Sequence, residues 1–329
     1  MRLLAAESPA GGEIAVLSHS NPGTPHYLTA ALEVDGIASG LYEEADINAG
    51  AERFGRLLAA CSGPTALADG VQLITRVVPV DPTEHELYVM KNHAVGAPDQ
   101  LMRSYTELIG EARDLCEQQR NYIVARFPMS GEFAEAARDL GGKVGDDEIR
   151  CRVVYDEMNR LATLASNAGM RPIRLLGPHR YAALLRHLQD PDYLIDDVEN
   201  IDFDTCWQES RTFRRYVMTN GKWSTRVARV TPGAVPTQPV HMRWTAPLLI
   251  GVQPAVIRTI SVLMSIIPPE KARSEAKKDV SEDRGRVLEA AKAGRVTDMT
   301  EEARVTSSQQ RLLDLQSGSG HAGVRWGMY

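Results

Sequence analysis

Alternating apolar positions predict a pair of strands near the start of the chain. The first covers residues 14–17 and the second residues 27–34, with the turn-rich segment HSNPGTP between them. Every second residue of the later strand is apolar, namely Leu28, Ala30, Leu32 and Val34. These side chains share one face, which we expect to lie in the core.

The next segments predict a strand-helix-strand unit. The stretch at 49–63 has helical spacing and ends at Gly63, and the apolar run VQLITRVVPV at 71–80 is typical of a strand. This order suggests a β-α-β crossover. A helix at 98–118 and a strand at 121–127 then extend the same layer of helices on a sheet.

A long helix is predicted from about Glu148, behind two acidic residues that can cap it. Apolar residues recur on one of its faces, at Val154, Met158, Leu161, Ala165 and Ala168. Gly169 is suited to the left-handed position after its last turn. The strand RPIRLLG and the helix PHRYAALLRHLQ follow. The acidic loop DPDYLIDDVENIDFD then marks the clearest change of composition, and we place a domain boundary near residue 195.

The strongest local signal in the second half is Asn220-Gly221, because this dipeptide suits the two positive-φ positions of a type I′ turn. RTFRRYVM and WSTRVARV flank it and predict a hairpin. The β-branched segment 256–267 predicts a strand covered on both faces. Charged helices are predicted at 270–293 and 300–316, and the first has a thin apolar stripe at Ala272, Ala276 and Val280. The last segment, VRWGMY, predicts a strand cut short, so we expect the chain to be truncated there.

Together these elements predict an α+β protein with mixed sheets, helices packed on one face and two subdomains. Residues 1–195 are expected to form an N-terminal domain of strand-helix-strand units. Residues 196–329 are expected to contain the hairpin, the strand and the charged helices.

The composition is that of a globular protein. The 329 residues are 43% hydrophobic and 24% charged, and a formal net charge of -6 argues against a strongly basic nucleic-acid coat. The segment 244–269 is the nearest to a membrane span, but Arg258 near its centre and Pro247 and Pro254 in its first half favour the strand interpretation. The start of the chain has no signal-peptide core. The four cysteines lack zinc-ligand spacing and are interpreted as buried free thiols: Cys61, Cys116, Cys151 and Cys206.

Motifs that carry known chemistry are absent. There is no phosphate-binding G-x-x-x-x-G-K-[ST], dinucleotide, zinc-protease, EF-hand or nucleophile-elbow pattern. His179 and His187 fall near one helix face but have no third ligand beside them, so we prefer surface histidines to a metal site. The acidic loop has carboxylates that suit Ca²⁺ or Mg²⁺, but their spacing fits no rigid loop and a solvated linker is preferred. We therefore predict no catalytic residue, no cofactor and no metal.

Basic and aromatic side chains concentrate on the predicted hairpin. The candidates for contact with an anion or a nucleic acid are Arg214, Arg215, Lys222, Trp223 and Arg226. Such side chains on a two-stranded ribbon can contact single-stranded DNA or anionic lipid headgroups. The alternative, which we favour, is a solvated sheet edge guarded by charge.

The second half carries a family resemblance. The segments WSTRVARV, TAPLLI, RTISVLMSIIPPEKARSEAKKDV and GHAGVRWGMY follow one another in this order. In this it resembles an actinobacterial family of conjugation-associated proteins, found beside type IV secretion genes and similar to the non-catalytic N-terminal part of VirB-type secretion ATPases. The first half agrees more loosely, through LTAALEVDG, SYTELI and LLGP. Family members usually carry transmembrane segments ahead of the paired strands, whereas this chain starts almost at the strands.

The resemblance and the missing phosphate loop imply a non-enzymatic structural component of a conjugative, type IV secretion-like translocation machinery that acts beside a separate ATPase. Expected partners are that ATPase, other machinery proteins, a second copy of the chain and, more weakly, DNA or anionic lipid, with no small-molecule substrate. The expected location is peripheral, at the cytoplasmic face of the membrane, with full-length relatives membrane-anchored. A soluble hydrolase or transferase with a dispersed active site is the alternative, because catalytic residues need not be adjacent in the chain.

Overall fold

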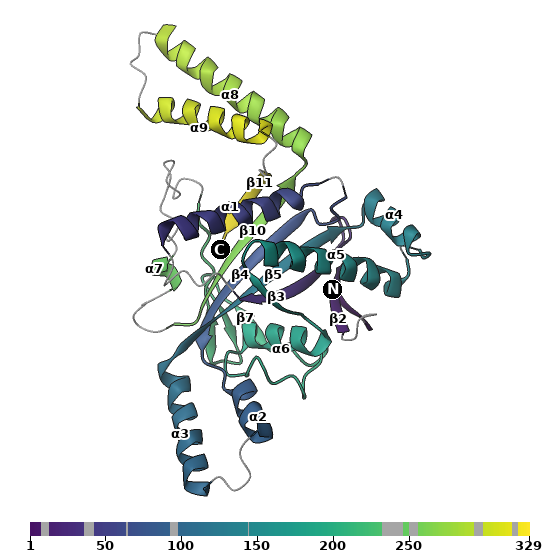
Figure 1. The fold of residues 1–329 in the computed structure, drawn as a ribbon, viewed down its shortest axis with the longest axis vertical. Coiled ribbons are helices and arrows are strands. Elements are labelled where there is room, and N and C mark those ends of the chain that lie inside the picture. Colours follow the sequence, from purple (N-terminus) through teal and green to yellow (C-terminus); the bar gives the residue numbers. More distant parts are fainter. Residues whose placement is uncertain are drawn as a thin grey trace.

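The fold is built on one large antiparallel sheet (Figure 1). The computed structural model describes residues 1–7, 13–35, 43–63, 65–92, 98–143, 145–231, 246–249, 256–292, 299–317 and 322–329. Within these ranges the large sheet has eight strands: β1 (Arg2–Glu7), β2 (Glu13–His19), β3 (Tyr27–Asp35), β4 (Gly70–Pro79), β5 (Glu117–Pro128), β6 (Arg171–Leu175), β10 (Arg258–Ile267) and β11 (Gly323–Met328). A smaller sheet contains β7 (Ser210–Thr212), β8 (Val217–Thr219) and β9 (Trp223–Thr225).

Helices cover both faces of the large sheet and also project beyond it. Those described are α1 (Glu44–Ala60), α2 (Thr83–Asn92), α3 (Asp99–Leu115), α4 (Gly131–Asp139), α5 (Asp147–Asn167), α6 (Pro178–Gln189), α7 (Ala246–Leu249), α8 (Pro269–Lys292) and α9 (Met299–Gln316). The predicted α+β class is confirmed. None of the described helices is both long and apolar enough to cross a membrane.

The strand order is β1-β2-β3-β5-β4-β10-β11, and β6 pairs with the free half of the β3 edge beyond β2. In the predicted strand-helix-strand unit β3-α1-β4, β5 lies between the two strands. The unit β5-α5-β6 is split in the same way by β3. Two interleaved split β-α-β units of this kind give the ferredoxin-like arrangement, which needs only local helix crossovers and antiparallel pairing.

The main core lies between the sheet and α1, α4 and α5. The predicted apolar face of β3 is confirmed, because Leu28, Ala30, Leu32 and Val34 are all buried there. The predicted face of α5 packs against it. The predicted ends of α5 are confirmed as well. The Asp146 carboxylate caps the start by accepting a hydrogen bond from the Glu148 backbone amide, and Gly169 after the last turn has a φ of +86°.

A second core lies on the opposite face of the sheet, under α6. Ala31 and Tyr122, which point away from the main core, pack there against Tyr181 and Leu184 of α6. The predicted packing of helices on one face is therefore correct for α1, α4 and α5. Helix α6 covers the other face, which was not expected.

The sheet runs across the predicted domain boundary near residue 195. Strand β10 pairs with β4 from Arg258↔Val77 to Ser265↔Gly70, so a strand of the second half completes the sheet of the first. The acidic loop is not the solvated linker that its composition predicts, because Ile195, Asp196 and Ile201 are all buried.

Three other sequence-based expectations are corrected. Cover on both faces of β10 is wrong at Leu263, which is 43% exposed. Cys116 is exposed, whereas the other three cysteines are buried as predicted. Helices α2 and α4 were not assigned from the sequence, since each is short and follows closely on a strand.

Two helical hairpins extend from opposite ends of the sheet (Figure 1). One, formed by α2 and α3, lies between β4 and β5 in the sequence; the other is formed by α8 and α9. The thin stripe of α8 is used inside the second hairpin, because Ala272 and Ala276 pack with Leu315 of α9 and Ile267 of β10. The backbone of β11 also approaches α8 closely: a Cβ at Gly323 would lie 2.4 Å from the Cβ of Ala272.

A buried ion-pair network ties the acidic loop to the sheet. The Asp196 side chain accepts from Arg120 of β5 and, at 3.2 Å, from Arg180 of α6. Its backbone amide donates to Asp81 at 3.0 Å. Burial alone would lower the pKa of Arg120, but the hydrogen bond and charge of Asp196 outweigh burial and raise that pKa above its ordinary value. Arg120 also pairs with Glu33 of β3, 3.0 Å away.

We predict that Asp196→Ala lowers the free energy of unfolding by about 3 kcal/mol, because it removes the carboxylate that pairs with Arg180 and leaves the largely buried Arg120 with one of its two carboxylate partners, Glu33. Urea unfolding followed by circular dichroism measures this change. The matched control is Glu282→Ala, which removes the exposed Lys278–Glu282 pair and should cost less than about 1 kcal/mol. Equal, small effects of the two substitutions would contradict the role given to Asp196.

Candidate functional site

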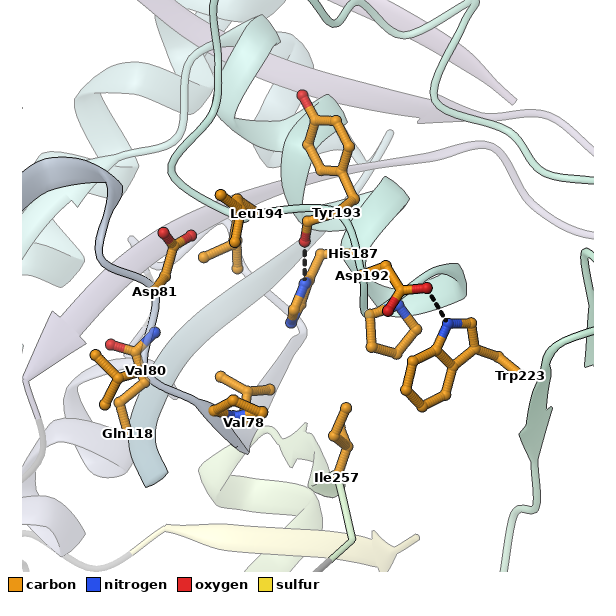
Figure 2. Close-up of a pocket in the computed structure, with 13 residues that line it drawn as sticks. Val78, Val80, Asp81, Gln118, His187, Asp192, Tyr193, Leu194, Trp223 and Ile257 are labelled. Carbon is orange, nitrogen blue, oxygen red and sulfur yellow. Dashed lines mark hydrogen bonds between the residues drawn. The ribbon is translucent and has the colours of Figure 1, made fainter. Parts of the chain in front are cut away.

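A cavity of about 230 Å³ lies at the C-terminal end of α6 (Figure 2). It is enclosed by the end of β4, the start of β5, the loop that follows α6, and two residues from the second half of the chain, Trp223 and Ile257. Most of its wall is apolar, with Val78 and Leu194 on either side of the opening shown in Figure 2. Pockets with an apolar wall and a few polar groups are the usual form of small-molecule sites.

His187 is the buried polar group of this cavity. The residue is 5% exposed, and its Nδ1 lies 2.7 Å from the backbone carbonyl oxygen of Tyr193. Because a carbonyl only accepts, Nδ1 carries the hydrogen and donates, which leaves Nε2 as an acceptor in the neutral ring. Among the described residues Nε2 has no hydrogen-bond partner, and Figure 2 shows it directed into the cavity.

A buried arginine lies behind the histidine. Arg76 is 4% exposed, and its guanidinium donates to the His187 carbonyl at 2.9 Å and to Thr259 at 2.7 Å. Burial lowers the pKa of Arg76 to about 10. Burial, followed by the positive charge of Arg76, lowers the pKa of His187 to about 4, so the ring is neutral at pH 7.

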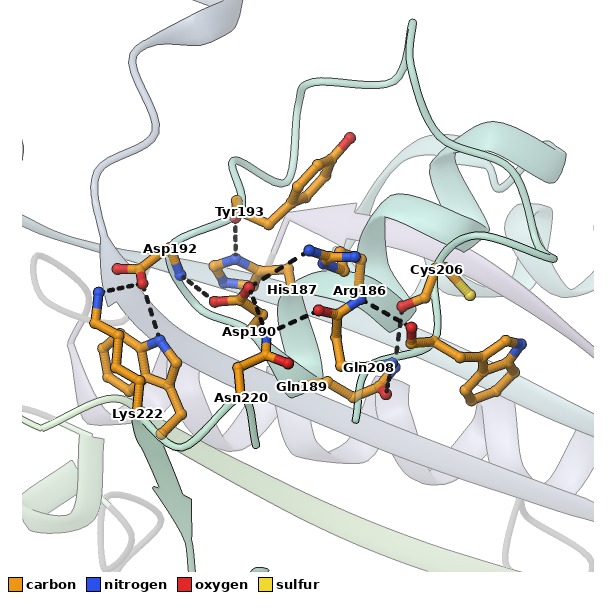
Figure 3. Close-up of polar contacts among 12 residues, drawn as sticks. Arg186, His187, Gln189, Asp190, Asp192, Tyr193, Cys206, Gln208, Asn220 and Lys222 are labelled. Atoms are coloured by element: carbon orange, nitrogen blue, oxygen red, sulfur yellow. Dashed lines mark hydrogen bonds and ion pairs between the residues drawn. The ribbon is translucent and has the colours of Figure 1, made fainter. Parts of the chain in front are cut away.

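The loop beside the cavity is held by side-chain amides (Figure 3). The side-chain oxygen of Gln189, the last residue of α6, accepts a hydrogen bond from the backbone amide of Gln208 at 3.0 Å. Asn220 of the predicted turn donates to Gln208 at 2.8 Å and to Asp190 at 3.3 Å. Asn220 and Gly221 have φ of 51° and 66°, which confirms the predicted turn geometry. The turn thus fixes the small sheet to the end of α6.

Asp192 joins the loop to the small sheet at the rim of the cavity. Its Oδ2 accepts from the indole Nε1 of Trp223 at 3.1 Å and forms an ion pair with Lys222. Figure 2 shows the indole directed at this carboxylate, and Figure 3 shows Lys222 directed at it. Trp223 therefore forms part of the cavity wall, and both Lys222 and Trp223 already have an acidic partner.

The five predicted contact residues do not form one patch. Lys222 and Trp223 lie at the β8–β9 turn. Arg214 and Arg215 lie between β7 and β8, at the other end of the small sheet, because Thr212 pairs with Val217 there. Arg226 follows β9 and lies at the end occupied by the two arginines. The structure thus separates the set into a rim pair and three exposed arginines.

The residues that line the cavity were missed as a site. His187 was considered only with His179, which instead lies against the carbonyl oxygen of Ile201 at 2.7 Å. No group of three metal-ligating side chains occurs within the ranges that the structure describes. The cavity is lined by residues from five segments that are far apart in the sequence, so no local spacing pattern could reveal it.

A second feature is an exposed apolar surface on the α2–α3 hairpin. Leu101, Tyr105 and Leu108 follow one another at helical spacing on α3 and are 62%, 37% and 59% exposed. We call these three residues the α3 stripe. On α2, Leu87 and Tyr88 are exposed as well, and His85 contacts Tyr105 at 2.7 Å. A cluster of large apolar side chains of this kind usually marks an interaction surface.

No protein-family model matches the chain, and no curated protein matches it significantly.

We predict that His187 makes the protein lose stability in mild acid. Its pKa is about 4 in the folded protein and 6.5 in the unfolded chain, so below pH 6.5 only the unfolded chain takes up the proton. The free energy of unfolding should therefore fall by about 2 to 3 kcal/mol between pH 7 and pH 4.5 on account of this group. Arg76, Asp81 and Arg120 are the charged neighbours that act on it.

The matched variant is His187→Asn, whose side-chain amide can still donate to the Tyr193 carbonyl but does not titrate. Urea unfolding of both proteins at pH 7 and pH 4.5 isolates the contribution of His187. The same loss of stability in the two proteins would show that His187 is not buried in its neutral form.

Proposed function

We propose that the chain is a non-enzymatic structural component of a conjugative, type IV secretion-like machinery, which it joins by docking the α2–α3 hairpin on a secretion ATPase. The type of machinery is taken from the family resemblance. The observation that carries the docking role is the α3 stripe, because a projecting helix with three large apolar side chains in solvent has unfavourable hydration that a partner removes.

The stripe fits the helix-in-groove mode of recognition. Leu101, Tyr105 and Leu108 stand at positions i, i+4 and i+7, the spacing by which a helix inserts anchors into an apolar groove. The two leucines and the tyrosine lie on the hairpin furthest from α8 and α9 (Figure 1). Docking there leaves the other hairpin accessible.

The charged side chains of the α2–α3 hairpin indicate what kind of surface the stripe would bind. The described acidic side chains of the hairpin, Glu86, Asp99, Glu107 and Glu111, outnumber the basic ones, Lys91 and Arg103. An acidic rim disfavours an anionic membrane surface and favours a protein groove flanked by lysine or arginine. We therefore assign the stripe to a groove with an apolar floor and basic edges on the ATPase.

The alternative of a soluble enzyme is favoured by one observation, the cavity with a buried histidine. However, a general base is most effective when its pKa lies near the working pH, and His187 has a pKa of about 4. Both oxygens of Asp81 accept backbone amides, from Thr83 and Asp196. The cavity is therefore better suited to binding than to proton transfer.

Contact of the arginines of the small sheet with DNA or anionic lipid stays a prediction. Arg214, Arg215 and Arg226 are exposed and lie at one end of the small sheet. Lys222 would have to leave Asp192 before it could bind a phosphate, so we expect it to contribute little.

We predict that Leu101→Ser combined with Leu108→Ser weakens binding to the purified secretion ATPase of the native host by at least tenfold. The two substitutions remove buried apolar area from the interface, where each large anchor typically contributes more than about 1 kcal/mol. Isothermal titration calorimetry with the purified partners measures the affinity. Glu107→Lys should also weaken binding, because the new lysine faces the basic edge of the groove. Added salt should weaken binding of the unaltered protein by screening the attraction, and should strengthen binding of this variant by screening the repulsion.

The matched control combines Leu288→Ser and Leu313→Ser on the other hairpin, where the leucines are 60% and 58% exposed. These substitutions should leave the affinity unchanged. Point substitutions are preferable to removal of residues 270–329, which would also delete β11 and uncover the edge of β10. Loss of binding in the control alone would move the docking surface to α8 and α9. No binding of the ATPase by the unaltered protein would refute the proposal.

A further inference from the structure

We propose that the cavity beside His187 binds a small, neutral aromatic molecule that donates one N–H or O–H hydrogen bond to His187 Nε2. The site is independent of the docking role of the α3 stripe. It departs from the sequence-based expectation of no small-molecule substrate, because the residues that line the cavity are brought together only by the fold.

The first argument is the hydrogen-bonding state of the histidine. Nδ1 is committed as a donor to Tyr193, so Nε2 presents a lone pair to the cavity. A buried acceptor without a partner is unfavourable, and a donor on a ligand would remove that cost. The ring is held in this orientation by the loop, whose position is fixed in turn by Asp196 and Asn220. The acceptor is thus preorganised.

The second argument is the shape and polarity of the wall. Val78, Leu194, Ile257 and the indole of Trp223 enclose the space into which Nε2 points (Figure 2). A dry cavity of about 150 Å³ is large enough for benzene. The cavity here, about 230 Å³, therefore has room for a molecule with two fused rings. Water molecules would find polar partners at a few points of this wall, among them Asp81, Gln118 and Asp192, whereas a flat apolar ring fills the volume between them and loses its own contact with water.

The charged groups around the cavity favour a ligand without a charge of its own. Asp81 accepts two backbone amides, and Asp192 is neutralised by Lys222 at the rim. Arg76 lies behind His187 and makes the interior unfavourable for a cation. Among the described lining residues, both carboxylates already have partners, and the buried donor that remains, Nε2 of Gln118, belongs to a neutral amide, so no unpaired charge there recruits an anion or an ammonium group. A neutral ligand is the class that remains.

The test compares two probes of the same shape. Indole has an N–H, and indene has a CH₂ group in its place, so the pair differs only in the donor. We expect indole to bind the unaltered protein about tenfold more tightly than indene, which corresponds to one hydrogen bond. Titration followed by ¹H–¹⁵N NMR gives both affinities and shows whether the shifted amides belong to residues 187–195.

Two variants separate the hydrogen bond from the cavity. In His187→Asn the acceptor at the position of Nε2 is lost, because the shorter side chain does not reach it, while the side-chain amide can still donate to Tyr193. The affinity for indole should therefore fall to that for indene. In Ile257→Trp the larger side chain fills the space, so both probes should fail to bind. Circular dichroism and thermal unfolding establish that each variant is folded.

The comparison of probes on the unaltered protein needs no variant and decides the matter if either variant fails to fold. Equal affinities of indole and indene would overturn the role of Nε2. No saturable binding of either probe would show that the cavity holds water only. Binding that survives Ile257→Trp would place the probes elsewhere. Each of these results leaves the docking of the α3 stripe unaffected, because that proposal is measured with the ATPase.

Discussion

The carboxylate of Asp196, which is almost completely buried, holds the acidic loop against the sheet. Its charge is tolerated there only because Arg120 and Arg180 approach from two different elements, β5 and α6. The same residue connects through its amide to Asp81, just after β4. The segment that precedes Asp196, residues 191–195, lines the cavity and places Asp192 where it binds Lys222 and Trp223. The candidate site is therefore a consequence of how one buried charge is neutralised.

The two ends of the sheet have different surfaces. The α8–α9 hairpin encloses its small apolar residues, with Ala272 and Ala276 fully buried, and its outer surface is highly charged, although Leu288 and Leu313 are exposed on it. The α2–α3 hairpin leaves its large apolar residues in solvent, although His85 and Tyr105 join its helices. The first hairpin is stable by its own packing, whereas the second gains from a partner. This difference, more than any single residue, makes the α2–α3 end the candidate for assembly.

The sequence predicts the elements better than their arrangement. Periodicity located β3, α5 and β10, and turn chemistry located Asn220-Gly221, because these signals are local. It could not show that β10 pairs with β4 or that α6 covers the far face, since pairing depends on residues far apart in the chain. The cavity was invisible for the same reason. Asp196 was misinterpreted as solvated because an aspartate in an acidic run is normally exposed, and only the positions of Arg120 and Arg180 reverse that expectation.

Strand β4 acquires its second neighbour late in synthesis. Its pairing with β5 involves nearby sequence, but the pairing with β10 joins residues such as Val77 and Arg258 across most of the chain. Until β10 leaves the ribosome, β4 presents a row of unpaired amides and carbonyls along an apolar strand, which is the surface on which chains aggregate. Slow closure of such long-range contacts also sets the folding rate. The nascent chain should therefore depend on chaperone protection until β10 has been made.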